Sequence, residues 1–438
     1  MSPMALGLLI GLITVVLLAT GIPIAFGLGF ASVAFLFVMH GADSLSILGE
    51  VFFGGIASFA LVALPMFILM GATVASSPAG RDLYVALDRW MSRVPGGIVV
   101  SNLGACSVFA ALSGSSPATC AAIGKMGIPE MRKRGVPADL AAGSIAAGGT
   151  LGILIPPSIT MIVYGVATET SIGRLFLAGV MPGLLLSGMF IGWTLFVAWR
   201  RGWKFGDRTR RFSLRERFEI LPKVLPFLAI IVGILYVLYG GIATPSEGAG
   251  VGAILCLLLV VLVYRMWHVP DLWRVLRDST RESVMIMMII AASELFSYMM
   301  SSLYVTQAIA QAIAALEINR WLLLGFVNVF LLVLGCFLPP VAIILMTAPI
   351  LLPIIIQAGF DPYWFAVILT INMEIGLITP PVGLNLFVIN GIAPDIRLQT
   401  VLRGARPFVL LMVLGIVILC VFPGIVTWLP DVLMGPAK

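Results

Sequence analysis

Charged residues are scarce in this 438-residue chain: Asp, Glu, Lys and Arg make up 11% of it, against 60% for hydrophobic residues. Such a composition offers too little polar surface to cover a water-soluble body of this size. The net charge of +6 would suit a nucleic-acid partner in a soluble protein, but basic loops at a membrane surface explain it more simply. We therefore expect a lipid bilayer as the surroundings and no nucleic acid as a partner.

Residues that commonly carry enzyme chemistry are also few. The five cysteines lie in apolar segments without CxxC spacing, and His40 and His268 each stand alone, which argues against a disulfide framework or a zinc site. No GxxxxGK[ST] phosphate loop is present, so no bound nucleotide is expected. A hydrolase using Ser115 or Ser116 as nucleophile would lack a nearby histidine base. We predict that the protein is not an enzyme.

Apolar stretches long enough for a bilayer core about 30 Å thick recur from Met4 to Trp428. Because no Lys or Arg precedes the first of them, it is interpreted as a retained span and not as a signal peptide. Hydropathy predicts an all-α polytopic membrane protein with about ten spanning helices, near residues 4–20, 24–40, 50–77, 138–168, 175–199, 223–240, 246–265, 279–301, 362–392 and 405–428. Two further apolar segments, 98–130 and 321–355, are predicted to be re-entrant hairpins.

Positive charge is distributed unevenly among the predicted loops. With the N-terminus outside, the cytoplasmic loops hold 23 of the 26 Lys and Arg residues, leaving Arg174, Arg320 and Lys438 elsewhere. Because cytoplasmic loops carry most of the Lys and Arg of membrane proteins, both termini are predicted to be periplasmic. The most basic segment, a cytoplasmic linker over residues 200–222, is interpreted as an anchor that faces anionic lipid.

One motif occurs twice in the chain: GILIPP at 152–157 returns 224 residues later as GLITPP at 376–381. Each copy contains three spans, a hairpin, a broken span and a last span. Because five crossings per copy is an odd number, the second copy must be inverted. Inverted repeats with discontinuous helices are a recurring architecture of secondary transporters, which bind substrate and coupling ions near the bilayer midplane.

The predicted division of the chain follows from this repeat. The first inverted repeat covers residues 1–199, with its hairpin at about 98–130 and its broken helix at about 138–168. The second inverted repeat covers residues 223–438, with its hairpin at about 321–355 and its broken helix at about 362–392.

The double prolines Pro156-Pro157 and Pro380-Pro381 are predicted to break their spans, because a proline inside a helix removes a hydrogen-bond donor and costs about 3 kcal/mol. Unpaired carbonyls and amides at membrane depth need protein, water or an ion to satisfy them. The alternative interpretation is that these prolines only kink the helices.

Small polar residues gather at the predicted hairpin tips. The first tip reads SGSSPAT at 113–119, and its counterpart reads GCFLPP at 335–340. Hydroxyls and free carbonyls are oxygen ligands suited to sodium, whereas half-helix N-termini favour an anion; close packing of helices is the alternative role. Of the acids in the spans, Glu374 is interpreted as a possible ion-site acid and Glu294 as a structural partner.

Four segments together resemble the large membrane subunit of TRAP (tripartite ATP-independent periplasmic) transporters, of the C4-dicarboxylate or sialic-acid type within the ion transporter superfamily. They read SGSSPATCAAIG at 113–124, GTLGILIPPSI at 149–159, ATPSEGAGVGA at 243–253 and EIGLITPPVGLNLFV at 374–388. The resemblance covers essentially the whole chain in order and spacing. It implies sodium-coupled import of organic acids such as C4-dicarboxylates or sugar acids, with an elevator motion of a transport domain against a scaffold.

The resemblance also implies site residues. Sodium would be held at the two tips and breaks by residues at these positions: Ser113, Gly114, Gly149, Thr150, Gly152, Gly335, Gly376 and Thr379. The residues expected to face the substrate are Ser115, Ser116, Thr379 and Asn385. Where the family often has an acid before the proline of the second hairpin, this chain has Pro339, so an ion site there would depend on the backbone.

The implied partners are a small membrane subunit of four helices, expected as a separate chain, and a soluble periplasmic binding protein that delivers the substrate. The implied location is the bacterial inner membrane. Two other interpretations stay open at this point: a sodium- or proton-coupled organic anion carrier that works without a binding protein, and a channel lined by broken helices.

Overall fold

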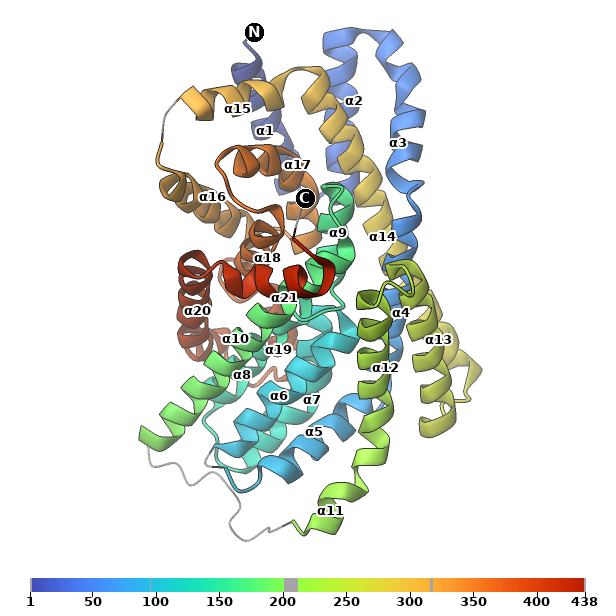
Figure 1. Cartoon of the computed structure of the whole chain (residues 1–438), viewed down its shortest axis with the longest axis vertical. Coiled ribbons are helices and arrows are strands. Elements are labelled where there is room, and N and C mark those ends of the chain that lie inside the picture. The colour runs from blue at the N-terminus through green and yellow to red at the C-terminus, as the bar shows by residue number, and fades with distance from the viewer. Residues whose placement is uncertain (1, 95, 201–211, 316–317, 437–438) are drawn as a thin grey trace.

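The computed structural model describes residues 2–94, 96–200, 212–315 and 318–436, and in these ranges every regular element is a helix (Figure 1). The all-α membrane fold predicted from hydropathy is thereby confirmed. Of the predicted linker at 200–222, residues 201–211 lie outside the described residues. The helices long and apolar enough to cross a membrane are η2–α4 (Phe59–Ser76), α10 (Ile172–Arg200), α12 (Leu221–Tyr239), α13 (Pro245–Tyr264), α14 (Val269–Ser302), α17 (Pro340–Gln357) and α20 (Leu398–Val421).

Shorter helices complete the described fold, and several of them form pairs around a turn or a break. They are α1 (Pro3–Ala19), α2 (Ile24–His40), η1 (Ala42–Ile47), α3 (Leu48–Ile56), α5 (Ala79–Met91), α6 (Gly97–Ser113), α7 (Ser116–Lys133), α8 (Ala138–Thr150), η3 (Leu151–Ile153), α9 (Ile159–Ala167), α11 (Leu214–Glu219), α15 (Val305–Ala315), α16 (Arg320–Gly335), α18 (Pro362–Leu377), α19 (Leu384–Ile392) and α21 (Gly424–Met434).

Large apolar side chains cover the outside of the molecule as well as its core. Leu8, Val38 and Leu410 are 71%, 75% and 69% exposed, and they come from helices on different sides of the fold. In water such a surface would aggregate, whereas lipid tails solvate it. Helices that are apolar on every face are the expected product of folding in a bilayer.

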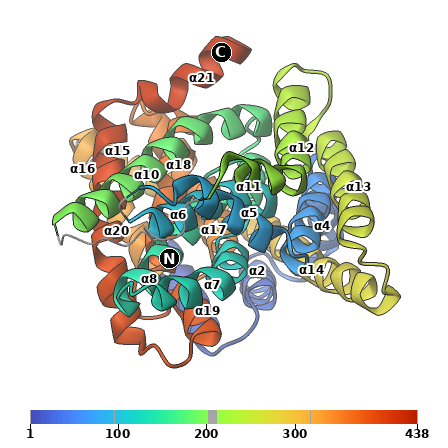
Figure 2. The same ribbon diagram turned by 90° about the horizontal axis from the view of Figure 1, so that it is seen from below.

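Contacts between the two halves of the chain are reciprocal. Helix α4 packs on α13, and its counterpart α14 packs on α2; α7 packs on α19, and its counterpart α17 packs on α9. At one end of the molecule α15 lies beside α1, and toward the other end α5 lies beside α12 (Figures 1 and 2). Two copies of one fold with opposite orientation produce this pattern.

The predicted single span over residues 50–77 is wrong in detail, because α3 ends at Ile56 and a short 3-10 turn precedes α4. Gly54 and Gly55 weaken the helix there by up to about 1 kcal/mol each relative to alanine. A Cβ on Gly55 would lie 2.9 Å from the Cβ of Glu294 on α14. A close contact between α3 and α14 therefore lies at the end of α3, just before the interruption.

Two buried carboxylates of helix α5 bind side chains from the neighbouring helices. The guanidinium of Arg134, just after α7, donates two hydrogen bonds of 2.8 Å to Asp88. Six residues earlier, Asp82 accepts a 3.0 Å hydrogen bond from the Tyr264 hydroxyl of α13 and lies 3.8 Å from the Lys223 ammonium of α12. One helix thus joins the first hairpin to the α12–α13 pair.

Replacing Arg134 with Gln is expected to destabilise the fold by about 2 kcal/mol, because it leaves the nearly buried Asp88 carboxylate without its cation. The matched control is Arg277→Gln, which removes a pair whose side chains are both 54% exposed and should change stability by less than about 0.5 kcal/mol. The measurement is the temperature at which half of the detergent-solubilised protein leaves the monodisperse peak in size-exclusion chromatography. Equal losses in both variants would contradict this assignment.

Candidate functional site: two hairpin tips and two broken helices

The first hairpin turns within two residues. Helix α6 ends at Ser113, Gly114 adopts a left-handed conformation with φ of 59°, and Ser115 is extended with φ of −140° before α7 begins at Ser116. A residue with a Cβ adopts the Gly114 conformation only with strain, and its Cβ would also lie 3.1 Å from the Pro157 carbonyl oxygen. Pro117 fits the first turn of α7, where no backbone N–H partner is required.

Hydroxyl groups close this tip from the inside. Thr119 Oγ1 donates a 2.9 Å hydrogen bond to the carbonyl of Ser115, and Ser113 Oγ lies 2.8 Å from Thr119 Oγ1. Ser113 Oγ also lies 3.4 Å from the Ser115 carbonyl oxygen, so both hydroxyls gather at this carbonyl. The sequence predictions included Ser113 and missed Thr119, although its place in the first turn of α7 was a usable signal.

The first broken helix contacts the first tip through its backbone. Helix α8 ends at Thr150 and α9 begins at Ile159, with η3 between them. A Cβ on Gly152 would lie 2.7 Å from the carbonyl carbon and oxygen of Ser115, so the tip lies directly on the broken segment. Of the residues expected to bind sodium there, Thr150 is buried, and its hydroxyl donates to the Ala147 carbonyl of its own helix at 2.5 Å.

The second tip and second break repeat this arrangement. A Cβ on Gly376 of α18 would lie 2.4 Å from the carbonyl carbon of Gly335, where α16 ends. The backbone N–H of Val382 donates a 3.1 Å hydrogen bond to the Cys336 carbonyl, which joins the broken segment to the tip. The partly exposed Thr379 donates to the Ile375 carbonyl at 2.6 Å, which leaves its oxygen lone pairs free to accept.

Two buried side chains near the breaks have oxygen atoms without partners in the described residues. Ser116 Oγ donates a 2.5 Å hydrogen bond to Glu374 Oε1, but Glu374 Oε2 has none. Asn385 Nδ2 donates to the Ala146 carbonyl at 3.3 Å, while its Oδ1 is unpaired. Both side chains are at least 99% buried, so neither faces an open cavity in this conformation. The structure therefore places Ser116 with Glu374, and Asn385 against α8.

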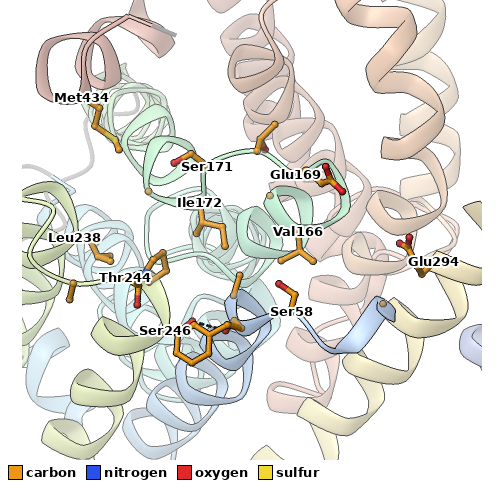
Figure 3. A pocket seen from close by; sticks show the side chains of 18 of the residues that line it. Ser58, Val166, Glu169, Ser171, Ile172, Leu238, Thr244, Ser246, Glu294 and Met434 are labelled. Carbon is orange, nitrogen blue, oxygen red and sulfur yellow. Dashed lines mark hydrogen bonds between the residues drawn. The ribbon is translucent and has the colours of Figure 1, made fainter. Parts of the chain in front are cut away.

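A separate cavity of about 570 Å³ opens among α3, the α9–α10 turn, the α12–α13 turn, α14 and α21 (Figure 3). The carboxyl groups of Glu169 and Glu294 both belong to its lining, and among the described residues that line it there is no Lys, Arg or His. Within the described residues Glu294 has no ion pair, so the expected structural partner is missing. This cavity was not predictable from local sequence patterns, because its lining comes from five distant segments.

Comparison with known proteins identifies one family over nearly the whole chain. The family described as "Tripartite ATP-independent periplasmic transporter, DctM component" matches residues 11–425. The C4-dicarboxylate TRAP transporter large permease protein DctM of Pseudomonas aeruginosa is 39% identical over 398 residues, which cover 91% of this chain and 92% of that protein. The sialic acid TRAP transporter large permease protein SiaM of Vibrio cholerae is 29% identical, over 96% and 97% of the two chains.

Solved structures show the same fold at much lower sequence identity. The YdaH transporter of Alcanivorax borkumensis superposes with a TM-score of 0.67 at 15% identity and covers 90% of this chain and 91% of its own.

Substituting Gly152 with alanine is expected to destabilise the protein by about 1–3 kcal/mol, because the new methyl group would overlap the Ser115 backbone. Gly188→Ala is the matched control: this glycine lies in α10 with nothing within 4 Å of the position of a Cβ, so alanine should be neutral or slightly stabilising. The measurement is the thermal unfolding midpoint of each variant, compared with wild type in the same detergent. A Gly152→Ala midpoint at or above wild type would show that the tip does not rest on the broken helix.

Proposed function

We propose sodium-coupled import of organic acids as the activity of this chain, which belongs to the DctM component family of tripartite ATP-independent periplasmic transporters. As a large permease subunit it is a multi-pass membrane protein that moves a solute, and it is not an enzyme. The proposal concerns the substrate class, the coupling ion, the motion and the partners.

The observation that carries the proposal is the arrangement of half-helix N-termini at the tips and breaks. Helices α7, α17 and α19 all begin there without a side-chain cap within the described residues. An uncapped N-terminus presents free N–H groups and the positive end of the helix dipole, which attract a carboxylate. Helices α7 and α19 also pack against each other. An organic acid would therefore find two such N-termini close together.

Substrate identity is proposed at the level of class. The relatives are named for C4-dicarboxylates and for sialic acid, which share carboxylate groups. Ser115, Ser116, Thr379 and Asn385 remain the residues proposed to contact the substrate. Because Ser116 and Asn385 are buried, we infer that the tip must move before either of them meets a ligand.

Sodium would be held by oxygen atoms, since no group of three or more His, Cys, Asp or Glu residues occurs in the part of the chain that is described. Carbonyls and hydroxyls of two small sets fit this role. The first set is Ser113, Gly114, Gly149, Thr150 and Gly152; the second is Gly335, Gly376 and Thr379. Each sodium ion entering the cell would gain about 2.3 kcal/mol per 100 mV, which can drive accumulation of the acid without nucleotide.

An elevator motion is proposed for the tips and broken helices, moving against the scaffold of α1–α4 and α12–α14. The partners proposed are a four-helix membrane subunit and a periplasmic binding protein, in a bacterial inner membrane with both termini of this chain periplasmic. The acidic cavity with Glu169 and Glu294 supports delivery by a partner, because two carboxylates would repel a free dianion that enters there unaided.

Proteoliposomes that contain this chain and its small partner should accumulate a C4-dicarboxylate or a sialic acid only with both an inward sodium gradient and the binding protein. Substrate uptake is measured with labelled acids, and replacement of sodium by potassium is the control. Sodium-driven uptake that is indifferent to the binding protein would indicate a stand-alone organic anion carrier. Uptake that does not saturate would indicate a channel.

Thr379→Ala is expected to raise the sodium concentration for half-maximal uptake about three- to tenfold, because it removes a hydroxyl ligand at the second break. That change corresponds to roughly 1 kcal/mol. Thr20→Ala is the matched control, since Thr20 is exposed at the end of α1 and its hydroxyl makes the same kind of bond, 2.6 Å to a carbonyl of its own helix. An unchanged sodium dependence in Thr379→Ala would remove this residue from the sodium site.

A further inference from the structure

One hydrogen bond joins the two inverted copies at the first hairpin tip. Ser116, the first residue of α7, donates to Glu374 Oε1 at 2.5 Å, although the two residues are 258 positions apart. Their exposed fractions are 0% and 1%, so water does not compete for the bond. A hydrogen bond to a buried carboxyl group in a dry environment is strong, and its loss leaves a polar group unsatisfied.

The carboxyl group is not needed to break its helix. The position in the first copy that corresponds to Glu374 is Thr150, 224 residues earlier, and the span there breaks at the equivalent motif without an acid. The Thr150 hydroxyl donates to its own helix and lies 3.9 Å from the sulfur of Met412. Glu374 therefore has a role that has no counterpart in the first copy. Its hydrogen bond with Ser116 fits such a role.

The same turn of α7 is held from a second direction. The glycine backbone at Gly152 lies against the carbonyl of Ser115, and a Cβ there would also approach the Ser116 nitrogen to 2.8 Å. Gly152 thus limits how far the tip can move toward the broken helix, while Glu374 attracts the Ser116 side chain. Together they determine the direction of the uncapped N-terminus of α7.

The bond also decides what Ser116 can offer to a ligand. A serine hydroxyl has one hydrogen, and here Glu374 accepts it. Only lone pairs of the Ser116 oxygen remain, so this hydroxyl can accept a hydrogen bond or contact a cation, but it cannot donate to a carboxylate. An acidic substrate that contacts Ser116 could then accept a hydrogen bond only from its backbone N–H, because the following residue, Pro117, has no N–H to offer.

We propose that Glu374 is a positioning residue: through its carbonyl-type oxygen it holds Ser116 and keeps the first hairpin tip oriented relative to the second copy. The inference rests on the proposed function only for the nature of the ligand that the tip receives. What Glu374 contributes is an acceptor at a fixed place, and glutamine can supply the same acceptor.

The test measures the tip itself in the absence of sodium and substrate, so it does not depend on transport. Ser115→Cys places a thiol at the partly exposed tip, and its reaction rate with a maleimide is followed in the detergent-solubilised chain. The rate for the parent chain, with its five native cysteines, is subtracted. In this background Glu374→Ala and Ser116→Ala are each expected to raise the rate about tenfold, and the double variant no further.

Glu374→Gln separates positioning from charge, because it keeps the acceptor oxygen and removes the ionisable group. Its labelling rate is expected to stay within about twofold of the background. A rate as high as that of Glu374→Ala, additive effects in the double variant, or no change in either alanine variant would each overturn the proposal. If Glu374→Ala does not fold, the labelling rates of Ser116→Ala and Glu374→Gln still test the proposal, because only the first is expected to rise. Failure of sodium-driven uptake would leave these rates unaffected and would count against the proposed function alone.

Discussion

Backbone pairing at membrane depth is the constraint on which the rest of this structure depends. A helix satisfies its own peptide groups, but the two broken spans release carbonyls and amides where lipid offers no partner. In the structure, a hairpin tip packs against each broken segment. Gly376 lies against Gly335, Val382 donates to Cys336, and Gly152 lies against Ser115. Polar backbone can thus persist inside the membrane, which a transport site requires.

Inversion of the repeat explains why each break meets a tip of its own copy and a half-helix of the other. Helices α7 and α19 pack together, as do α17 and α9, so both copies contribute to each region. The copies nevertheless differ in side chains. Glu374 occurs in the second copy where the first has Thr150; Glu374 accepts a hydrogen bond from Ser116, whereas Thr150 contacts the sulfur of Met412. The two copies are therefore chemically different within one repeated fold.

The hairpin tips and the cavity lined by Glu169 and Glu294 differ in the sign of the charge that they favour. Uncapped N-termini at the tips favour an anion, whereas the cavity lined by Glu169 and Glu294 disfavours it. Helix α5, held by Asp82 on one side and Asp88 on the other, links the hairpin to the outer helices.

Composition and local pattern determined the helical membrane fold, because runs of about 20 apolar residues in this 60% hydrophobic chain span a bilayer as helices, which satisfy their own peptide groups. Double prolines and the serine-rich segment were also visible in the sequence, since their effect on a helix is local. Tertiary structure alone decided that Ser116 meets Glu374, that Thr119 closes the tip, and that Thr150 faces Met412. Side-chain direction and contacts across 258 residues depend on how the helices pack, and no local pattern encodes that packing.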